Sequence, residues 1–187
     1  ERGYNIHLFE AEYNQVERQL LDSTSELYEF DANYVVVFQS THKLAERHSL
    51  LSPKEQKCLA DERIGFITEF CGNLLLKNKK IIYFNYPEID DTVFGSYANK
   101  ISSSLLYQTR RLNYKLMELL PQYPNLFVCD IAGLQNKFGR NMMFAPNIYV
   151  STEMVLSVDA IPYVSSRVID IIAACQGQFK KCLILDL

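Results

Sequence analysis

Tryptophan is absent from the sequence, histidine occurs three times, and none of the five cysteines stands in a C-x-x-C pair. So few imidazoles make a histidine-built metal site a poor hypothesis, and an odd number of cysteines argues against a disulfide framework or a zinc site. We expect reduced, buried thiols in a reducing compartment, the cytoplasm. No apolar run approaches the roughly 20 residues of a membrane span and no signal peptide opens the chain, so we expect no membrane partner.

The balance of charge excludes a further class of partners. The 187 residues include 22 acidic and 19 basic side chains, a net charge of −3, so no basic field draws the chain to nucleic acid. With 48% apolar and 22% charged residues, the composition is that of a globular protein. The length suits one domain, or one domain with a fragment of another. Because the chain starts at Glu1 rather than Met, we expect residues before it.

Strand-like and helix-like segments alternate along the chain. Short runs of β-branched and aromatic residues predict five strands, around Ile6, Val36, Ile82, Phe127 and Ile184. Apolar residues at helical spacing predict helices over residues 13–22, 64–75, 101–119 and 164–175. Alternation with connections long enough for right-handed crossovers predicts an α/β fold, a three-layer, doubly wound arrangement around a mostly parallel sheet.

The ends of these helices are marked in the sequence. The run Ser52-Pro53-Lys54-Glu55 is the clearest helix start, because Ser52 can cap, Pro53 suits the first helical position and Glu55 can reach back to the cap amide. We expect Pro121 to end the helix over 101–119 and Gly177 to end the last one. The polar piece 176–178 is the expected domain boundary.

Polar side chains follow the predicted strands. In open parallel sheets ligands bind beyond the carboxyl ends of the strands, so these side chains are the candidates for a site. They are Glu10, Glu12, Gln39, Ser40, Thr41, His42, Asn85, Tyr86, Pro87, Glu88, Asp130 and Asp186. Among them we take Gln39, Ser40 and Asn85 as substrate-binding candidates. For Asp130 we favour a cap on the following helix.

Common catalytic motifs are missing. The sequence has no G-x-S-x-G elbow, no phosphate-binding glycine-rich loop and no H-E-x-x-H. Ser40 and His42 share one predicted loop, too close in sequence to form a nucleophile–base pair. Asp22-Ser23 follows a helix, where the nucleophile of a GDSL-type hydrolase follows a strand, so we interpret it as a helix end and cap. For the basic group at 110–115 we favour a solvated helix face over a surface for an acidic partner.

The last eight residues, KKCLILDL (180–187), resemble the opening of a haloacid dehalogenase (HAD) superfamily domain, in which a hydrophobic strand delivers the first aspartate of D-x-D-x-T. Further segments resemble the N-terminal region of FkbH-like proteins, so that the resemblance covers nearly the whole chain. These segments are FEAEYNQ (9–15), DSTSELYEF (22–30), YVVVFQS (34–40) and LSVDAIP (156–162).

The resemblance implies a domain organisation and an activity. FkbH-like proteins join an SGNH-hydrolase-like α/β domain to a HAD-type (HAD-IIIC) phosphatase domain. Residues 1–176 would be the SGNH-like, flavodoxin-like domain without its own first strand, and residues 177–187 a linker and the first HAD strand, displaced from the first sheet. Asp186 would be the nucleophile and an Mg²⁺ ligand in the complete domain, with no cofactor expected in this fragment. The implied partners are the downstream HAD domain in cis and an acyl carrier protein, onto which members load a glyceryl unit from a phosphorylated glycerate.

The chain departs from the SGNH pattern in ways that bear on function. The Gly-Asp-Ser block of such a domain belongs upstream of Glu1, and the Asp-x-x-His expected before the last helix is replaced by EMVLS (153–157), without histidine. We therefore expect a catalytically degenerate domain for substrate or carrier-protein recognition, without esterase activity of its own. Two alternatives stay open: an active SGNH esterase whose nucleophile block lies upstream, and a non-enzymatic protein-binding module.

Overall fold

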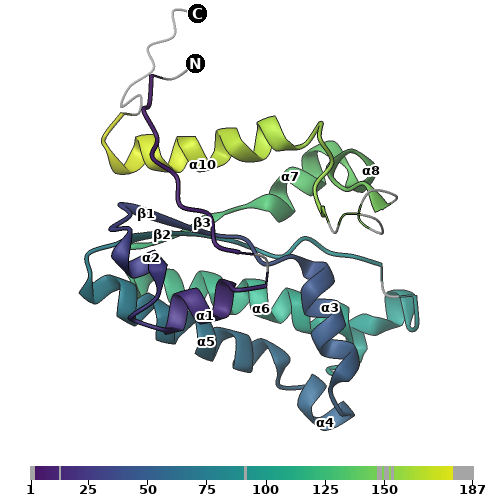
Figure 1. Cartoon of the computed structure of the whole chain (residues 1–187). Coiled ribbons are helices and arrows are strands. Elements are labelled where there is room, and N and C mark those ends of the chain that lie inside the picture. Colours follow the sequence, from purple (N-terminus) through teal and green to yellow (C-terminus); the bar gives the residue numbers. More distant parts are fainter. Residues whose placement is uncertain are drawn as a thin grey trace, which may run out of the picture.

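The structure is a computed structural model that describes residues 3–12, 14–90, 92–146, 149, 152 and 154–178. It is a mixed α/β fold around a three-stranded parallel sheet in the order β1-β2-β3 (Figure 1). The strands are β1 (Tyr34–Val37), β2 (Lys80–Phe84) and β3 (Leu126–Cys129). Val36 lies opposite Ile82, and Ile82 lies opposite Phe127. The parallel sheet and three of its predicted strands are therefore confirmed.

The two outermost predicted strands fare differently. The segment around Ile6 has no strand pairing, so the prediction of a strand there is wrong for the described residues. The physical reason is that a strand needs a hydrogen-bonded neighbouring strand, and an alternating pattern of side chains does not show whether such a neighbour exists. The predicted strand around Ile184 lies outside the described residues.

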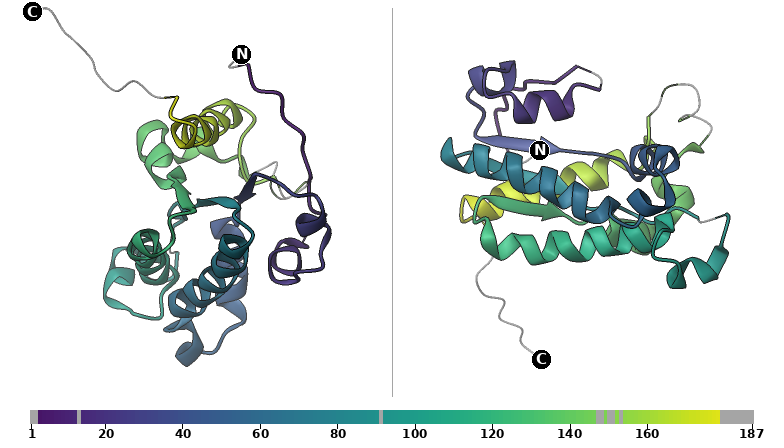
Figure 2. Two further views of the ribbon diagram at one scale, coloured as in Figure 1. Left: turned by 90° about the vertical axis from the view of Figure 1, so that its left-hand side faces the viewer. Right: turned by 90° about the horizontal axis from the view of Figure 1, so that it is seen from below.

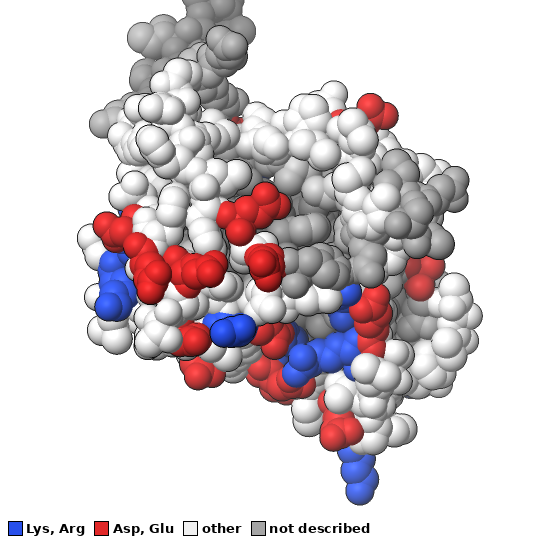
Figure 3. Space-filling view, viewed as in Figure 1, with Lys and Arg blue, Asp and Glu red and all other residues white. Residues whose placement is uncertain are grey.

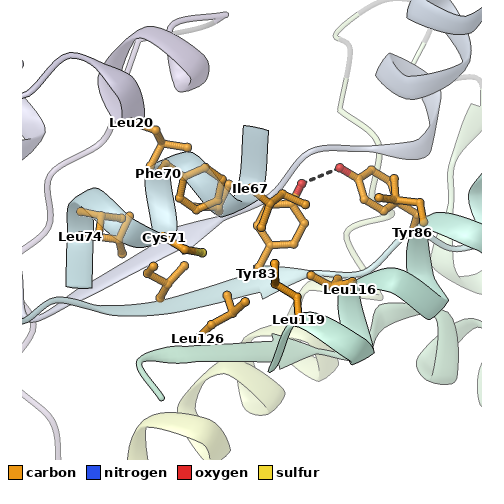
Figure 4. Packing of buried hydrophobic residues seen from close by; sticks show 14 of the residues in the cluster. Leu20, Ile67, Phe70, Cys71, Leu74, Tyr83, Tyr86, Leu116, Leu119 and Leu126 are labelled. Atoms are coloured by element: carbon orange, nitrogen blue, oxygen red, sulfur yellow. Dashed lines mark hydrogen bonds between the residues drawn. The ribbon is translucent and has the colours of Figure 1, made fainter. Parts of the chain in front are cut away.

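One face of the sheet is covered by a helical layer and a continuous apolar core (Figures 1 and 2). Val35, Val37 and Tyr83 point into this core and pack against buried side chains of the helices. The elements of this layer are α3 (Thr41–Leu50), α4 (Pro53–Gln56), α5 (Leu59–Leu76), η1 (Gly95–Lys100), α6 (Leu105–Leu119) and η2 (Leu120–Gln122). Figure 4 shows how Phe70, Tyr83 and leucines from α5 and α6 fill the space between sheet and helices.

The opposite face carries a second, smaller core. It is built by α7 (Ile131–Phe138), α8 (Arg140–Met143) and α10 (Ile161–Cys175). Ile82 and Phe84 point to this side, where they pack with residues such as Ile131 and Val164. Because successive residues of a strand face opposite sides, the run 81–84 is apolar throughout and serves both cores.

The described residues between 3 and 30 lie beside β1 rather than in the sheet. Segment 3–12 runs past β1 toward two short helices, α1 (Val16–Leu21) and α2 (Glu26–Glu29) (Figures 1 and 2). Its ends are attached: the Tyr4 hydroxyl donates to Gln178 Oε1 at 2.6 Å, and the Phe9 ring lies 5.6 Å from that of Phe30. Helix α1 confirms the helix predicted over 13–22, although it is shorter.

The predicted helix ends are largely confirmed. Ser52 and Glu55 form the capping box, but the helix they start is a single turn, and α5 begins separately at Leu59. Pro121 lies in the η2 turn that ends α6, and Gly177 ends α10 with a positive φ of 72° that favours glycine. Asp22 is the C-cap of α1, as predicted, whereas Ser25 rather than Ser23 is the N-cap of α2.

Candidate functional site

Two groups of polar side chains lie at the carboxyl edge of the sheet. We call the first the buried cluster; it consists of Glu17, Gln39, Arg63, Tyr83 and Tyr86. We call the second the polar groove; it is lined by Tyr86, Glu88, Arg110, Asn113, Ala132, Gln135, Asn136 and Arg140. Tyr86 belongs to both, so the two groups adjoin.

The buried cluster is centred on Arg63 of α5, whose residue surface is 4% exposed. Its Nη2 donates to Gln39 Oε1 and its Nη1 to Glu17 Oε1, both at 2.7 Å. The guanidinium also lies over the Phe66 ring, 4.5 Å from its centre. The Tyr83 hydroxyl donates to the same Gln39 oxygen at 3.1 Å. The cluster thus joins α1, the end of β1, α5 and β2 around one charged group.

The charge state of the cluster follows from these contacts. Burial by itself would lower the pKa of Arg63, but the neighbouring Tyr86, Glu17 and Tyr83 together raise it, so the guanidinium stays charged. Burial raises the pKa of Tyr83, and that of Tyr86, so both stay protonated. Their hydroxyls hydrogen-bond to each other at 2.6 Å (Figure 4). None of these groups is therefore poised to exchange a proton near neutral pH.

A second set of contacts holds the start of α7 at the end of β2. Asn85 Nδ2 donates to Asp130 Oδ1 at 2.7 Å, and Asn85 Oδ1 accepts from the Ala132 backbone N–H at 3.0 Å. Asp130 is the N-cap of α7 and accepts from the Gly133 N–H at 2.8 Å, which confirms its predicted role as a cap. Both side chains thus satisfy amides that a helix start leaves unpaired.

The polar groove has a volume of about 530 Å³, within the size range of small-molecule sites. Glu88 contacts three other lining residues. Arg110 Nε and Nη2 donate to the two Glu88 carboxylate oxygens at 2.6 and 2.9 Å. Gln135 Nε2 and Arg140 Nη2 donate to the Glu88 carbonyl at 2.8 and 2.9 Å. Most of the polar atoms lining the groove therefore fix the loop after β2, and the charge of Arg110 is already balanced.

The segment after β1 is not the loop that we predicted. Ser40 is the N-cap of α3, and its Oγ accepts from the Lys43 N–H at 3.2 Å, so Thr41 and His42 lie on the first turn of a helix. Thr41 Oγ1 donates to the Pro87 carbonyl at 2.6 Å, which ties this turn to the loop after β2. The Ser40 side chain stabilises this helix start by accepting a hydrogen bond from a backbone amide. The spacing of apolar residues in the sequence did not indicate that a helix begins here.

His42 differs from its neighbours because part of its hydrogen-bonding capacity is unused. Its Nδ1 is buried without a hydrogen-bond partner among the described residues, and its ring lies 4.6 Å from that of Tyr149. Burial lowers the pKa of His42, against a weaker effect of Glu46, so the ring stays neutral near pH 7. No imidazole hydrogen-bonds a hydroxyl within the part of the chain that the structure describes, since His48 Nε2 contacts the Ser103 carbonyl instead.

The remaining predicted candidates lie apart from this site or outside the structure. Glu10 and Glu12 are exposed on segment 3–12, and acidic groups gather over α1 and α2 on the face shown in Figure 3. Arg111 and Lys115 of α6 form ion pairs with Asp61 of α5, at 2.9 and 3.0 Å. Asp186 lies outside the described residues, so its predicted role is untested.

Sequence analysis missed two groups that organise the site, Arg63 and the Glu88–Arg110 pair. A signal for Arg63 exists, because it falls at helical spacing between the buried Ala60 and Ile67. A charged residue on a buried helix face needs a partner, and this spacing could have singled it out. Nothing in the spacing of Glu88 and Arg110, 22 residues apart, indicates their pairing.

The described residues do not offer a site for a divalent cation. Within residues 3–12, 14–90, 92–146, 149, 152 and 154–178, no three His, Cys, Asp or Glu side chains come together as ligands. Mg²⁺ requires a set of hard oxygen ligands, and the Asp130 carboxylate already accepts hydrogen bonds from Asn85 and Gly133. In the same ranges, no helix combines the length and the apolar character needed to cross a membrane.

Comparisons with known proteins give two matches. The model of the family described as "FkbH, N-terminal domain" matches residues 1–173. The crystal structure of the N-terminal part of the protein BF1531 from Bacteroides fragilis, containing a phosphatase domain complexed with Mg, is similar with a TM-score of 0.94 and 55% identity. The match covers 100% of this chain and 49% of the Bacteroides fragilis chain, so this chain spans about half of the length of that protein chain. No curated protein sequence gives a significant match.

Proposed function

The chain belongs to the FkbH N-terminal domain family, and from this membership we propose that it is the non-hydrolytic recognition domain of a larger protein whose downstream HAD-type domain performs Mg²⁺-dependent phosphoryl chemistry. The similar Bacteroides fragilis protein supports the proposal, because its other half is long enough for a further domain and its description names a phosphatase domain with Mg. The free cysteines among the described residues are compatible with a cytoplasmic protein.

The observation that carries the non-hydrolytic role is the occupation of the strand-end side chains. Ser40 Oγ accepts a helix amide, Gln39 Oε1 accepts from Arg63 and Tyr83, and Asn85 bridges Asp130 and Ala132. An ester hydrolase needs a nucleophile hydrogen-bonded to a base near oxyanion donors. Side chains that are already engaged in holding loops can shape a binding crevice instead.

The domain organisation that we propose follows the same lines. Residues 1–176 form an SGNH-like, doubly wound domain, which is supported by a parallel sheet with helices on both faces. Residues 177–187 are the linker and first strand of the HAD-like domain. Asp186, at the end of that strand, is the proposed nucleophile and Mg²⁺ ligand. An acyl carrier protein that receives a glyceryl unit is the proposed macromolecular partner.

The complete protein tests the catalytic half of the proposal. Asp186→Asn should lower phosphate release from a small phosphomonoester at least about 1,000-fold, because a carboxamide cannot form the aspartyl-phosphate. Phosphate release should also stop with EDTA. The matched control is Asp159→Asn, an exposed carboxylate in the turn before α10, which should keep the parent rate. Parent-like activity of Asp186→Asn would exclude this nucleophile.

A second assay tests the non-hydrolytic half. Hydrolysis of p-nitrophenyl acetate by the complete protein should not exceed that of a heat-denatured sample, because the described residues lack a nucleophile–base pair. Ser40→Ala should leave this background unchanged. Turnover above background, whether or not it disappears in Ser40→Ala, would instead support an active esterase.

A further inference from the structure

The loop after β2 is held through its backbone rather than through the carboxylate of Glu88. Gln135 Oε1 accepts from the Glu88 N–H at 3.1 Å, and Gln135 Nε2 donates to the Glu88 carbonyl at 2.8 Å. Asn113 contacts Tyr86 in the same way, since its Oδ1 accepts from the Tyr86 N–H at 2.9 Å and its Nδ2 donates to the Tyr86 carbonyl at 2.7 Å. Each amide side chain satisfies one backbone donor and one backbone acceptor. The loop therefore does not depend on the Glu88 carboxylate for its position.

The Glu88 carboxylate instead occupies the guanidinium group of Arg110. It lies across Nε and Nη2, which is the bidentate geometry in which arginine also binds the carboxylates and phosphates of ligands. The side chains of Arg110 and Glu88 are 51% and 40% exposed, so water competes for both partners and the pair contributes little to stability. A dissolved acid can therefore replace Glu88 on Arg110 at little cost.

Arg140 is in a similar situation in the same groove. Its Nη1 binds Asp90 Oδ2 at 2.5 Å, and the Asp90 side chain is 82% exposed. Its Nη2 donates to the Glu88 carbonyl, whereas Arg110 binds the carboxylate of the same residue. The two guanidinium groups thus bind opposite ends of one glutamate residue, a span that a single small molecule can bridge.

The residues that line the groove determine which charge a ligand can carry. Among the described residues that line it, Arg110 and Arg140 are positive and Glu88 supplies the only negative charge. When the Glu88 side chain turns into solvent, two positive charges remain beside the amide side chains. The volume of about 530 Å³ suits a small molecule. The complementary ligand is therefore a small molecule with two acid groups.

We propose that the polar groove binds a small dianion, a molecule that carries two carboxylate or phosphate-type groups. Arg110 and Arg140 each bind one acid group. Glu88 competes with the ligand for Arg110, and because its backbone is held by Gln135, its side chain leaves the groove on binding without displacing the loop. Binding here requires neither Asp186 nor a downstream domain, so the inference does not depend on the proposed function.

Titration calorimetry of the complete protein tests the class of ligand. The probes are succinate, with two carboxylates, phosphonoacetate, with a carboxylate and a phosphonate that a phosphatase does not hydrolyse, and acetate, with one carboxylate. EDTA is present throughout to remove the metal of the proposed phosphatase site. Succinate or phosphonoacetate should bind with a Kd below about 1 mM and at least about tenfold more tightly than acetate. The tighter of the two identifies a dicarboxylate or a phosphate-type ligand. If neither binds more tightly than acetate, the inference is overturned.

Paired variants separate the groove from any other anion site. Arg110→Gln should weaken binding of the tighter probe at least about tenfold, because it removes the charged donor. Glu88→Gln should tighten binding about tenfold, because the internal competitor loses its charge. The matched controls, Arg111→Gln and Asp61→Asn, alter a neighbouring ion pair outside the groove and should leave Kd within about twofold. Binding by Glu88→Gln that is no tighter than that of the parent would overturn the inference, and so would controls that shift Kd as much as the groove variants.

Discussion

The buried cluster and the polar groove adjoin at Tyr86, and both contain an arginine bound to a glutamate. The two arginines differ in their exposure to solvent. Arg63 is almost fully buried and makes its hydrogen bonds to two residues, Glu17 of α1 and Gln39 after β1. Arg110 is exposed and binds Glu88 in a bidentate geometry at the protein surface. Water can replace the partners of Arg110, whereas the Arg63 guanidinium is covered by protein even though the side chain of its partner Glu17 is 47% exposed. The same pair of residue types therefore supports the fold in one place and shapes a surface in the other.

Removing each arginine in turn should show the largest difference. Arg63→Met keeps much of the apolar volume but leaves Gln39 and Glu17 without their charged donor, so we expect a loss of about 2–3 kcal/mol in the free energy of unfolding. Arg110→Met should cost less than about 1 kcal/mol, because its ion pair is exposed. Urea unfolding of both variants measures the two values. Equal losses would show that burial does not separate the two arginines.

Asn85 is half-buried, and its replacement should give an intermediate effect. Asn85→Ala removes the hydrogen bonds to Asp130 and Ala132, and we expect a loss of about 1–2 kcal/mol from the weakened start of α7. Asn136→Ala, at an exposed position of the same helix, is the control and should change stability by less than about 0.5 kcal/mol. A parent-like urea midpoint for Asn85→Ala would mean that Asp130 alone is enough to cap α7.

His42 should give the smallest effect, visible as a dependence on pH. Its folded pKa lies below the ordinary value of 6.5 because of burial, so the unfolded chain binds more protons as pH falls below 6.5. The stability due to a neutral His42 is thus present above pH 6.5 and is lost as pH falls toward the folded pKa. His42→Phe should reduce the change of the urea midpoint with pH between about pH 7.5 and 5. Parallel curves for both proteins would show that His42 titrates alike in the folded and unfolded states.

The parts of the fold that were predictable are those in which burial leaves a local signature. The runs 34–37, 81–84 and 126–129 are apolar because parallel strands pack on both faces, and this signal can be recognised without knowing the neighbouring strands. Ser52 and Glu55 predicted a helix start because a capping box is complete within four residues. The segment around Ile6 shows the limit: its pattern suits a strand, but pairing depends on a partner elsewhere in the chain.

The site was less predictable because its contacts are long-range. Arg63 binds Glu17 and Gln39, which are 46 and 24 residues away, and no spacing in the sequence links them. The capping role of Asp130 was predictable because it acts on an amide three residues ahead. Ser40 acts at the same short range, yet it was assigned to a loop, because a helix start without the acidic or proline companions of Ser52 is a weak signal.

The exposed edge of β1 has a practical consequence for handling pieces of this protein. Tyr34–Val37 is a run of β-branched and aromatic residues without an internal charge, and among the described residues only β2 pairs with it, so its outer backbone groups can pair with the same strand of another molecule. Such edges act as templates for aggregation unless something covers them. Shorter versions of the complete protein that retain β1 with this edge open should therefore become less soluble as their concentration rises. Val36→Lys should keep these shorter versions in solution, because a charge on the edge strand opposes pairing with a second copy.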